Sequence, residues 1–262
     1  MSPGADARFD SAAATHVGKV RAQNEDNFLT RPEIGLWAVA DGMGGHEAGG
    51  LASAAAVEAL RRLPPPATAS DMLQACERGM IEANDVIRGI AAARGFEVIG
   101  TTIVILLIAD GYFACLWSGD SRVYRVRSGV IAQITRDHSE AQEMIDQGLL
   151  SEDDAKSWPR RNVITRAIGV FEKPELDLEH GEVEAGDVFV LCSDGLTAHV
   201  EAHEIAACAA KVQAQNACDN LVSLTLERGA QDNVTVVVVR YKPDGDTLVM
   251  PEGAPPGVGN SP

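Results

Sequence analysis

The fold of this chain is decided by residues 36–60, LWAVADGMGGHEAGGLASAAAVEAL. The segment starts with the apolar run 36–40, which is typical of a buried strand. That run ends abruptly at Asp41-Gly42, and a glycine cluster and an alanine-rich stretch with helical character follow. The strand ends on a carboxylate, and the glycines beside it leave the neighbouring space free of side chains. This arrangement raises the question of what the carboxylate binds.

The composition is that of a globular protein with an acidic balance. The chain has 262 residues, of which 45% are hydrophobic and 23% charged, enough for one large domain or two small ones. The formal net charge of -16 argues against nucleic acid and anionic membranes as partners, because both select for basic surfaces. Any cluster of aspartates in such a chain must be stabilised by something positive.

The cysteines and the N-terminal sequence indicate a cytoplasmic protein. The five cysteines lack the CxxC or His/Cys spacing of zinc sites, so we expect buried, reduced thiols. The N-terminus lacks the basic-then-apolar pattern of a signal peptide. The longest strongly apolar run, IVILLIA at 103–109, is too short to cross a bilayer. We therefore expect no membrane association.

The chain is predicted to form one domain between two irregular ends. Residues 1–12 are expected to be a flexible arm, and the Pro/Gly-rich residues 243–262 a disordered tail. Within the domain, residues 13–242, the polar segment 137–175 is interpreted as an excursion between core strands.

The hydrophobic pattern predicts many strands and a few long helices. Two hairpins are marked by Asp110-Gly111 and Ser128-Gly129, which are typical of tight turns between antiparallel strands. The predicted strands are 14–20, 26–31, 34–40, 101–109, 111–118, 121–127, 130–135, 187–193 and 233–241. The predicted helices are 47–62, 71–93, 202–211 and 216–228, with short ones at 139–147 and 151–156. This order favours an α+β fold with antiparallel sheets covered by helices.

Acidic residues recur at the ends of the predicted apolar strands. An aspartate next to a glycine is usually a turn residue, and Asp110 and Asp187 are interpreted that way. If the strands pack in one sandwich, however, the other acidic residues could converge at one edge, where they would repel each other unless protonated or bound to cations. Oxygen ligands without His or Cys indicate Mg²⁺ or Mn²⁺. The converging set is Asp41, Asp120, Asp194 and Asp232, with Glu25-Asp26 at the mouth of another strand.

Arg21 lies four residues before Glu25, close to the predicted acidic edge. A guanidinium group presents a planar fork that suits the oxygens of a phosphate. The alternative is a surface ion pair between Arg21 and Glu25, which would carry no function.

Six short motifs together resemble one known family. They occur in the same order as in the metal-dependent PP2C-type (PPM) serine/threonine phosphatases of the compact bacterial form. The resemblance runs from about His16 to Tyr241, nearly the whole chain. The motifs are RAQNED (21–26), VADGMGGHEAG (39–49), GTT (100–102), GDSRVY (119–124), LCSDGL (191–196) and QDNVTVVVV (231–239).

The resemblance implies a central antiparallel β-sandwich flanked by helix pairs, in an α-β-β-α arrangement. It also implies a centre of two Mn²⁺ or Mg²⁺ ions at one edge of the sandwich, with room for a third ion in bacterial members. Residues 137–175 match the variable flap of the family, and His138 within them is expected to be structural.

Carried over by motif, the family's site residues fall on the acidic edge. Asp41 would bridge the two ions and Gly42 would offer its carbonyl oxygen. Glu25 and Asp26 would hold metal-bound waters, and Arg21 would bind the substrate phosphate. The remaining ligands would be Asp194 and Asp232 for the first ion, and Asp120 with Asp194 for the third.

The implied reaction is in-line attack on phosphorus by a water that the two ions share, without a phosphoenzyme. One position departs from the animal enzymes, which have a histidine directly after the Asp-Gly pair, where this chain has Met43. His46 is then a candidate for the acid that protonates the leaving group. The alternatives are that His46 is structural and that a metal-bound water supplies the proton.

The leading hypothesis is a protein phosphatase for phosphoserine and phosphothreonine. Family membership implies phosphorylated proteins as partners, such as substrates of a bacterial Ser/Thr kinase, the kinase itself or a forkhead-associated-domain protein. The alternatives are a catalytically weak scaffold with the same fold, and a phosphatase for anti-sigma-factor antagonists. A monomer is expected.

Overall fold

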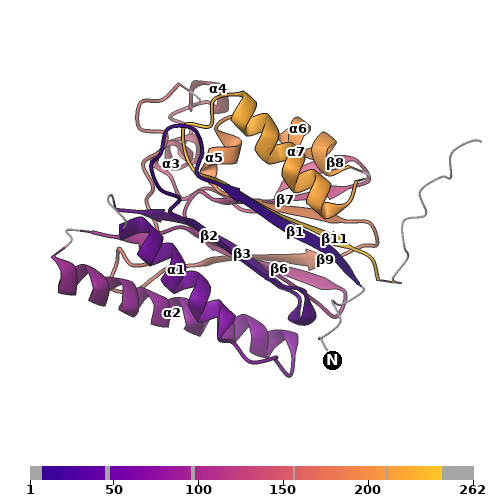
Figure 1. Cartoon of the computed structure of the whole chain (residues 1–262), viewed down its shortest axis with the longest axis horizontal. Helices are drawn as coiled ribbons and strands as arrows, with labels where there is room; N and C mark the ends of the chain where they lie inside the picture. The colour runs from indigo at the N-terminus through magenta and orange to yellow at the C-terminus, as the bar shows by residue number, and fades with distance from the viewer. Residues whose placement is uncertain (1–7, 45–47, 96–97, 156, 211, 244–262) are drawn as a thin grey trace, which may run out of the picture.

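The computed structural model describes residues 8–44, 48–95, 98–155, 157–210 and 212–243. Two antiparallel β-sheets lie face to face, and a pair of helices covers the outer face of each sheet (Figure 1). This is the α-β-β-α sandwich of the α+β class that the sequence predicts. The two predicted ends, and the candidate acid His46, lie wholly or partly outside the described residues.

The first sheet contains the first and the last strand of the chain side by side. Helices α6 (Ala202–Ala209) and α7 (Ala214–Glu227) cover its outer face. Its strand order is β1 (Phe9–His16), β11 (Val234–Tyr241), β10 (Val188–Cys192), β7 (Arg122–Arg127) and β8 (Val130–Gln133).

The second sheet contains the opening segment of the sequence. Helices α1 (Ala48–Arg61) and α2 (Ala69–Arg94) cover its outer face. Its strand order is β2 (Asp26–Arg31), β3 (Leu36–Met43), β5 (Ile103–Ala109), β6 (Tyr112–Ser118) and β9 (Asp177–Glu182), with β4 (Gly100–Thr101) paired to β3 and the turn η1 (Pro32–Ile34) before β3.

Strand β3 is apolar over residues 36–40 because both of its faces are buried there. Successive side chains of a strand point to opposite faces of the sheet. Trp37 and Val39 therefore pack between the two sheets, whereas Leu36, Ala38 and Ala40 pack against the helices. The small alanines on the outer face allow α1 to lie close to the strand.

Two strands differ from the prediction. Strand β1 begins at Phe9, where the sequence predicts an arm to residue 12 and a strand at 14–20. Residues 9–12 pair with β11, and Phe9 is buried against Trp37, so a single aromatic anchor ties this segment to the sandwich. Strand β9 was not predicted, because its sequence DLEHGE is polar and it lies at the sheet edge, where most of its side chains are exposed.

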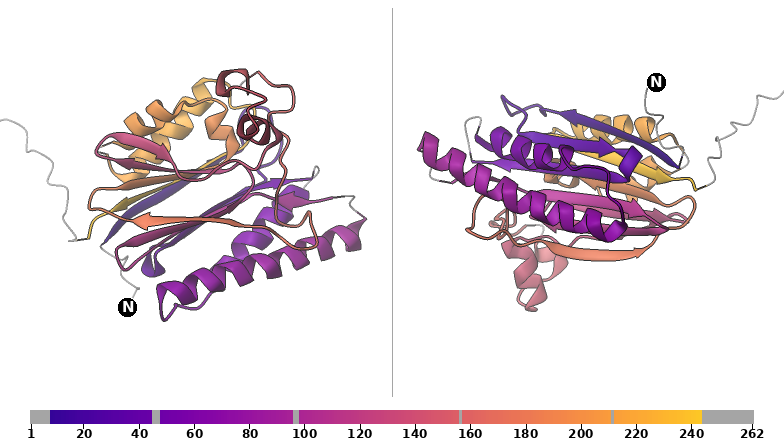
Figure 2. Two further views of the ribbon diagram at one scale, coloured as in Figure 1. Left: turned by 180° about the vertical axis from the view of Figure 1, so that it is seen from behind. Right: turned by 90° about the horizontal axis from the view of Figure 1, so that it is seen from below.

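The predicted excursion projects beside the sandwich and contains the short helices α3 (Glu140–Asp146) and α4 (Glu152–Ala155) (Figure 2). Its two limbs meet at a bridge between Ser139 and Ile164. Its C-terminal end is held by the buried amide of Asn84, which accepts a hydrogen bond from the Gly169 N–H and donates to the carbonyl of Phe171. In the part of the chain that the structure describes, no helix is both long and apolar enough to span a membrane.

Candidate metal centre

Five of the six predicted acidic residues line one cavity of about 280 Å³ at an edge of the sandwich, and the sixth, Asp26, is not among its lining residues. The antiparallel register explains why they meet: Asp26 at the start of β2 lies opposite Asp41 near the end of β3. In the other sheet, the end of β10 lies beside the starts of β7 and β11. The lining residues are Arg21, Glu25, Asp41, Gly42, Met43, Gly44, Asp120, Asn162, Ile164, Asp194, Asp232 and Asn233.

Asp41 is held by its backbone. Its N–H donates to Thr102 Oγ1 at 3.1 Å, and its carbonyl accepts from the Thr102 N–H at 2.8 Å and from Thr101 Oγ1 at 2.9 Å. Thr102 Oγ1 is also 2.8 Å from Ser121 Oγ, next to Asp120. The two threonines of the GTT motif therefore position Asp41 and connect it to the next acidic residue.

Gly42 lets helix α1 approach the end of β3. A Cβ atom at residue 42 would lie 2.1 Å from the Gly49 carbonyl oxygen and 2.7 Å from that of Glu25. Both contacts are far shorter than atoms tolerate, and both involve backbone that cannot easily shift. The glycines after Asp41 thus serve close packing of the helix as well as leaving space beside the carboxylate.

Asp194 and Asp232 come from the first sheet. Asp194 begins the short helix α5 (Asp194–Thr197) directly after β10, and Asp232 precedes β11. Ser193 joins the two sheets here, because its Oγ donates to Asp26 Oδ2 at 2.8 Å and accepts the Thr235 N–H at 3.0 Å. The edge is therefore tied across the sandwich by hydrogen bonds.

The carboxylates raise each other's pKa. Burial first, and then the charges of Asp26, Asp194 and Asp120, hold the pKa of Asp41 well above its usual range. Burial and the charge of Asp194 raise the pKa of Asp26 to about 6 and that of Asp120 to about 8. Burial and the charge of Asp232 also raise the pKa of Asp194. Such a cluster is electrostatically unfavourable without positive charge.

Two divalent cations fit this donor set. All the acidic donors are oxygens, which Mg²⁺ and Mn²⁺ prefer. Asp26 is 6% exposed, and its Oδ1 atom is buried with no hydrogen-bond partner, so a polar contact is missing there. Among the described residues, however, no three carboxylate, imidazole or thiol side chains form a ready-made cage. The residues thus supply the ligand chemistry and the shared cavity, but not a finished coordination geometry.

Arg21 forms an ion pair with Asp232, not with Glu25 as the alternative proposed. Its Nη2 lies 2.6 Å from Asp232 Oδ2, and this hydrogen bond raises the pKa of the guanidinium. The Arg21 side chain lines the cavity and is 55% exposed, so guanidinium donors that Asp232 does not use are open to solvent.

Glu25 lies between the cavity and helix α1. Its Oε1 accepts the Gly49 N–H at 3.1 Å, and its own carbonyl accepts from Ser53 Oγ. A carboxylate near the first turn of a helix is stabilised by the free N–H groups there. This contact holds Glu25 at the acidic cavity, as the sequence predicts.

Asn233 organises the loop that carries Arg21 and Glu25, a role that the sequence did not predict. Its Oδ1 accepts the Glu25 N–H at 2.8 Å, and its Nδ2 donates to the carbonyls of Val17 and Gln23, each at 2.9 Å. Its place in the QDN motif was the available signal. Thr102 and Ser193 were missed in the same way, inside motifs that were noted for their neighbours.

Both turn assignments agree with the structure. Asp110 and Gly111 both have positive φ, 53° and 80°, as the predicted tight hairpin requires. Asp187 closes a turn, since its N–H donates to the Glu184 carbonyl at 3.0 Å, and its buried carboxylate also binds the guanidinium of Arg127 at 2.6–2.8 Å. Neither residue lines the acidic cavity.

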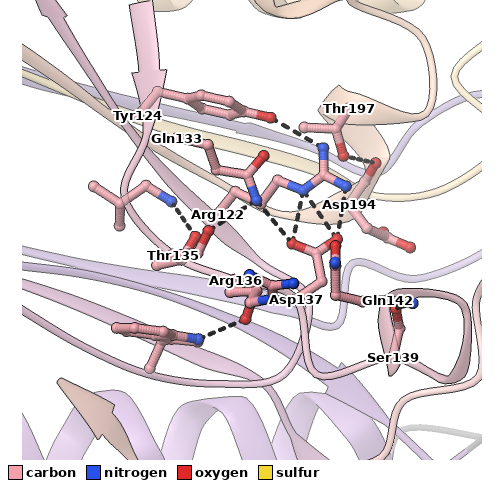
Figure 3. Close-up of polar contacts among 12 residues, drawn as sticks. Arg122, Tyr124, Gln133, Thr135, Arg136, Asp137, Ser139, Gln142, Asp194 and Thr197 are labelled. Carbon is pink, nitrogen blue, oxygen red and sulfur yellow. Dashed lines mark hydrogen bonds and ion pairs between the residues drawn. The ribbon is translucent and has the colours of Figure 1, made fainter. Parts of the chain in front are cut away.

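A half-buried cation, Arg122, lies beside the acidic cluster. The guanidinium of Arg122 lies beside Asp194 (Figure 3), and its charge lowers the pKa values of Asp194 and Asp120 against the larger effect of burial. Asp137 already neutralises Arg122 through hydrogen bonds of 2.6–3.1 Å. Arg122 therefore does not remove the need for further positive charge in the cavity.

Comparison with known proteins agrees with this geometry. Residues 16–231 match the family model described as protein phosphatase 2C. The chain is 36% identical over 229 residues to the serine/threonine protein phosphatase PstP of Mycobacterium tuberculosis, covering 87% of this chain but only 44% of that protein. It is 33% identical over 234 residues to the serine/threonine phosphatase stp of Listeria innocua, covering 86% and 93% of the two chains.

Solved structures give the same result. The fold is similar to PppA of Pseudomonas aeruginosa, with a TM-score of 0.83, 43% identity and coverage of 89% of this chain and 97% of that one. It is also similar to the catalytic domain of PstP in complex with two manganese ions, with a TM-score of 0.82, 34% identity and coverage of 89% and 98%. The family match spans most of the chain, and the acidic edge is at the place where the fold brings its strand ends together, so this chain belongs to the protein phosphatase 2C family, as a catalytic domain of the bacterial serine/threonine phosphatase type.

Proposed function

We propose that this chain hydrolyses phosphoserine and phosphothreonine in proteins with the help of two Mn²⁺ or Mg²⁺ ions bound at the acidic edge. The observation that carries the proposal is the convergence of Asp41, Asp194 and Asp232 on one cavity that has Arg21 at its mouth. When bound, two close divalent ions supply positive charge and a water of lowered pKa. The residues of the chain do the rest.

The proposed roles follow from where each residue lies. Asp41 stands between the two sheets' carboxylates and would bridge the ions, with the Gly42 carbonyl as a further ligand. Asp194 and Asp232 would bind the first ion, and Glu25 and Asp26 would orient waters on the opposite side of Asp41.

Arg21 would bind the phosphate of the substrate. Its ion pair with Asp232 sets its position, and its exposed donors would hold two phosphate oxygens beside the ions. The guanidinium would then stabilise the charge on the phosphoryl oxygens during transfer.

Asp120, together with Asp194, would bind a third ion. Asp120 is 8% exposed and lines the same cavity, and its raised pKa shows that its charge is poorly compensated. Met43 lines the cavity at the position where the animal enzymes have histidine, so the proton for the leaving group would come from His46 or from a metal-bound water.

The partners would be phosphorylated proteins, including those of a bacterial Ser/Thr kinase, the kinase itself or a forkhead-associated-domain protein. The relatives named as serine/threonine phosphatases support this class of substrate. PppA is described as a key regulatory component of T6SS in its organism, and a regulatory substrate is proposed here by analogy.

The experiment is hydrolysis of a phosphothreonine peptide by the purified chain with Mn²⁺, with Mg²⁺ and with EDTA. We expect turnover with either metal and none with EDTA. Asp41→Asn should abolish turnover, whereas Asp110→Asn, which makes the same change in an exposed turn away from the cavity, should retain it. Folded protein that is inactive with both metals would contradict the proposal and favour the scaffold alternative.

A further inference from the structure

We propose that His138 is a positioning residue for the corner that carries Asp120, and that it acts through the unprotonated Nδ1 atom of its imidazole. We call residues 119–122 the Asp120 corner. The contacts of His138 alone support its role in the geometry of the Asp120 corner. An effect of His138 on metal affinity rests in addition on the proposed function, in which Asp120 binds a third ion.

His138 binds both backbone groups of the glycine that precedes Asp120. The Gly119 N–H donates to His138 Nδ1 at 3.2 Å, and the Gly119 carbonyl accepts the His138 N–H at 2.9 Å. Gly119 has a φ of 116°, and a Cβ there would lie 2.6 Å from Thr102 Cβ. The corner thus has a conformation that regular strand pairing does not support, and His138 supplies its hydrogen bonds.

The same contacts determine the tautomer of the ring. Because the Gly119 N–H donates to Nδ1, the proton of the neutral imidazole must be on Nε2. Nε2 lies 3.1 Å from Asp177 Oδ2 on β9, which accepts that proton's hydrogen bond. The ring also stacks on Trp117 with 6.0 Å between centroids. Burial lowers the pKa of His138, which favours this neutral form.

The residue before His138 holds the other end of the corner. Asp137 accepts hydrogen bonds from Nε and Nη2 of Arg122 at 2.9 and 2.6 Å (Figure 3). Residues 137 and 138 therefore bind Arg122 and Gly119, on either side of Asp120. The sequence interpretation of His138 as a structural residue misses this placement next to the cavity.

His138 also lies where the two limbs of the excursion 137–175 come together. Its carbonyl accepts the Thr165 N–H at 2.8 Å, and the next residues pair with 163–164. Arg166, on the returning limb, donates to Asp177 Oδ1 at 2.8 Å, so the His138 ring and this limb share one carboxylate. Since Asp120 and Ile164 both line the acidic cavity, His138 contacts the corner and the excursion close to where each of them meets the cavity.

Two substitutions of His138 distinguish the roles of its two ring nitrogens. In His138→Asn, the side-chain oxygen can occupy the place of Nδ1 and still accept the Gly119 N–H. In His138→Gln, the amide reaches toward Nε2 and Asp177 but leaves the Gly119 N–H without its acceptor. His180→Gln, at an exposed position on β9, is the matched control.

The first readout is hydrogen exchange of the Gly119 amide in the metal-free protein. We expect exchange about tenfold faster in His138→Gln, which corresponds to about 1.4 kcal/mol, because a buried donor that loses its acceptor costs about 1–3 kcal/mol. His138→Asn should stay within about threefold of the wild type, as should His180→Gln. Equal acceleration in both His138 variants, or in neither, would overturn the proposal.

The second readout links the corner to the ion site. The Mn²⁺ concentration for half-maximal activity should rise in both His138→Gln and Asp120→Asn. It should be nearly unchanged in His138→Asn. If Asp120→Asn itself leaves the Mn²⁺ dependence unchanged, the third-ion role has failed, and the exchange result still decides on His138.

A measurement on the wild type covers the case in which the variants do not fold. Nitrogen-15 NMR of the imidazole should show a neutral ring with its proton on Nε2 at neutral pH. A ring protonated on Nδ1 would contradict the proposed hydrogen bond to Gly119.

Discussion

Asp26 and Asp41 face each other across two hydrogen-bonded strands, where like charges are usually destabilising. Several aspartates beside them increase the repulsion, and burial increases it further. The proposed two-ion centre would use this charge. The pairing of β2 with β3 brings Asp26 and Asp41 together although they are far apart in the sequence.

Arg21 is expected to act on substrate binding rather than on the fold. Arg21→Ala should raise KM for a phosphothreonine peptide by about 10-fold or more and change kcat much less, because charge-assisted contacts to phosphate are lost. Steady-state kinetics at saturating Mn²⁺ would measure the effect. Arg21→Lys is the control, since it keeps the charge but loses the planar fork, and its KM should fall between the two. An unchanged KM in Arg21→Ala would remove Arg21 from the site.

The sequence predicted the acidic residues of the site but not the residues that hold them. Asp41, Asp120 and Asp194 stand out because a carboxylate at the end of an apolar run is visible in the sequence. Asn233 and Thr102 act through hydrogen bonds to backbone that is far away in sequence, such as that of Glu25 and Asp41. No local pattern announces such a contact before the fold is known.

At the scale of elements, the buried strands, the tight turns and the edge strands β2 and β8 were predictable, whereas the edge strand β9 and the start of the edge strand β1 were not. Strand β3 is buried on both faces, so its apolar run has one interpretation. Strand β9 lies beside β6 because Asp177–Glu182 pair with it through backbone hydrogen bonds. Any polar sequence can make such bonds, so the side chains of this segment do not mark it as a strand. The start of β1 was misplaced for a similar reason, since FDSAAATH contains few residues with a strong strand preference.

The junction of β3 and α1 depends on the absence of a side chain at residue 42. Gly42→Ala should lower the free energy of unfolding by about 1–3 kcal/mol, because the new Cβ collides with backbone oxygens of Gly49 and Glu25. Gly89→Ala on α2 is the matched control: nothing lies within 4 Å of a Cβ there, and alanine should stabilise the helix by up to about 1 kcal/mol. Urea denaturation of both variants would test this, and equal stability of Gly42→Ala and wild type would refute the close packing.

At the scale of the whole molecule, the acidic edge couples metal binding to stability. The chain has a net charge of -16, and five of its carboxylates line one cavity at the edge of the sandwich. Cations that bind the folded edge and not the unfolded chain stabilise the fold by mass action. The apo protein should therefore be the less stable form of the enzyme.

Thermal unfolding measures this coupling. Mn²⁺ at about 100 times its dissociation constant adds about 2.7 kcal/mol, which corresponds to a rise in Tm of about 5–10 °C for a domain of this size. Asp41→Asn should lose this response and, without metal, should melt no lower than the wild type, because one repelling charge is gone. Asp110→Asn should respond as the wild type does. A Tm that ignores Mn²⁺, or an equal response in Asp41→Asn, would contradict the coupling.

The most direct test of the central claim is the anomalous diffraction of crystals grown with Mn²⁺. The account predicts two strong manganese peaks on either side of the Asp41 carboxylate, one of them in contact with Asp194 and Asp232. A cavity without manganese peaks in crystals of protein that is active with Mn²⁺, or peaks bound away from Asp41, would contradict it.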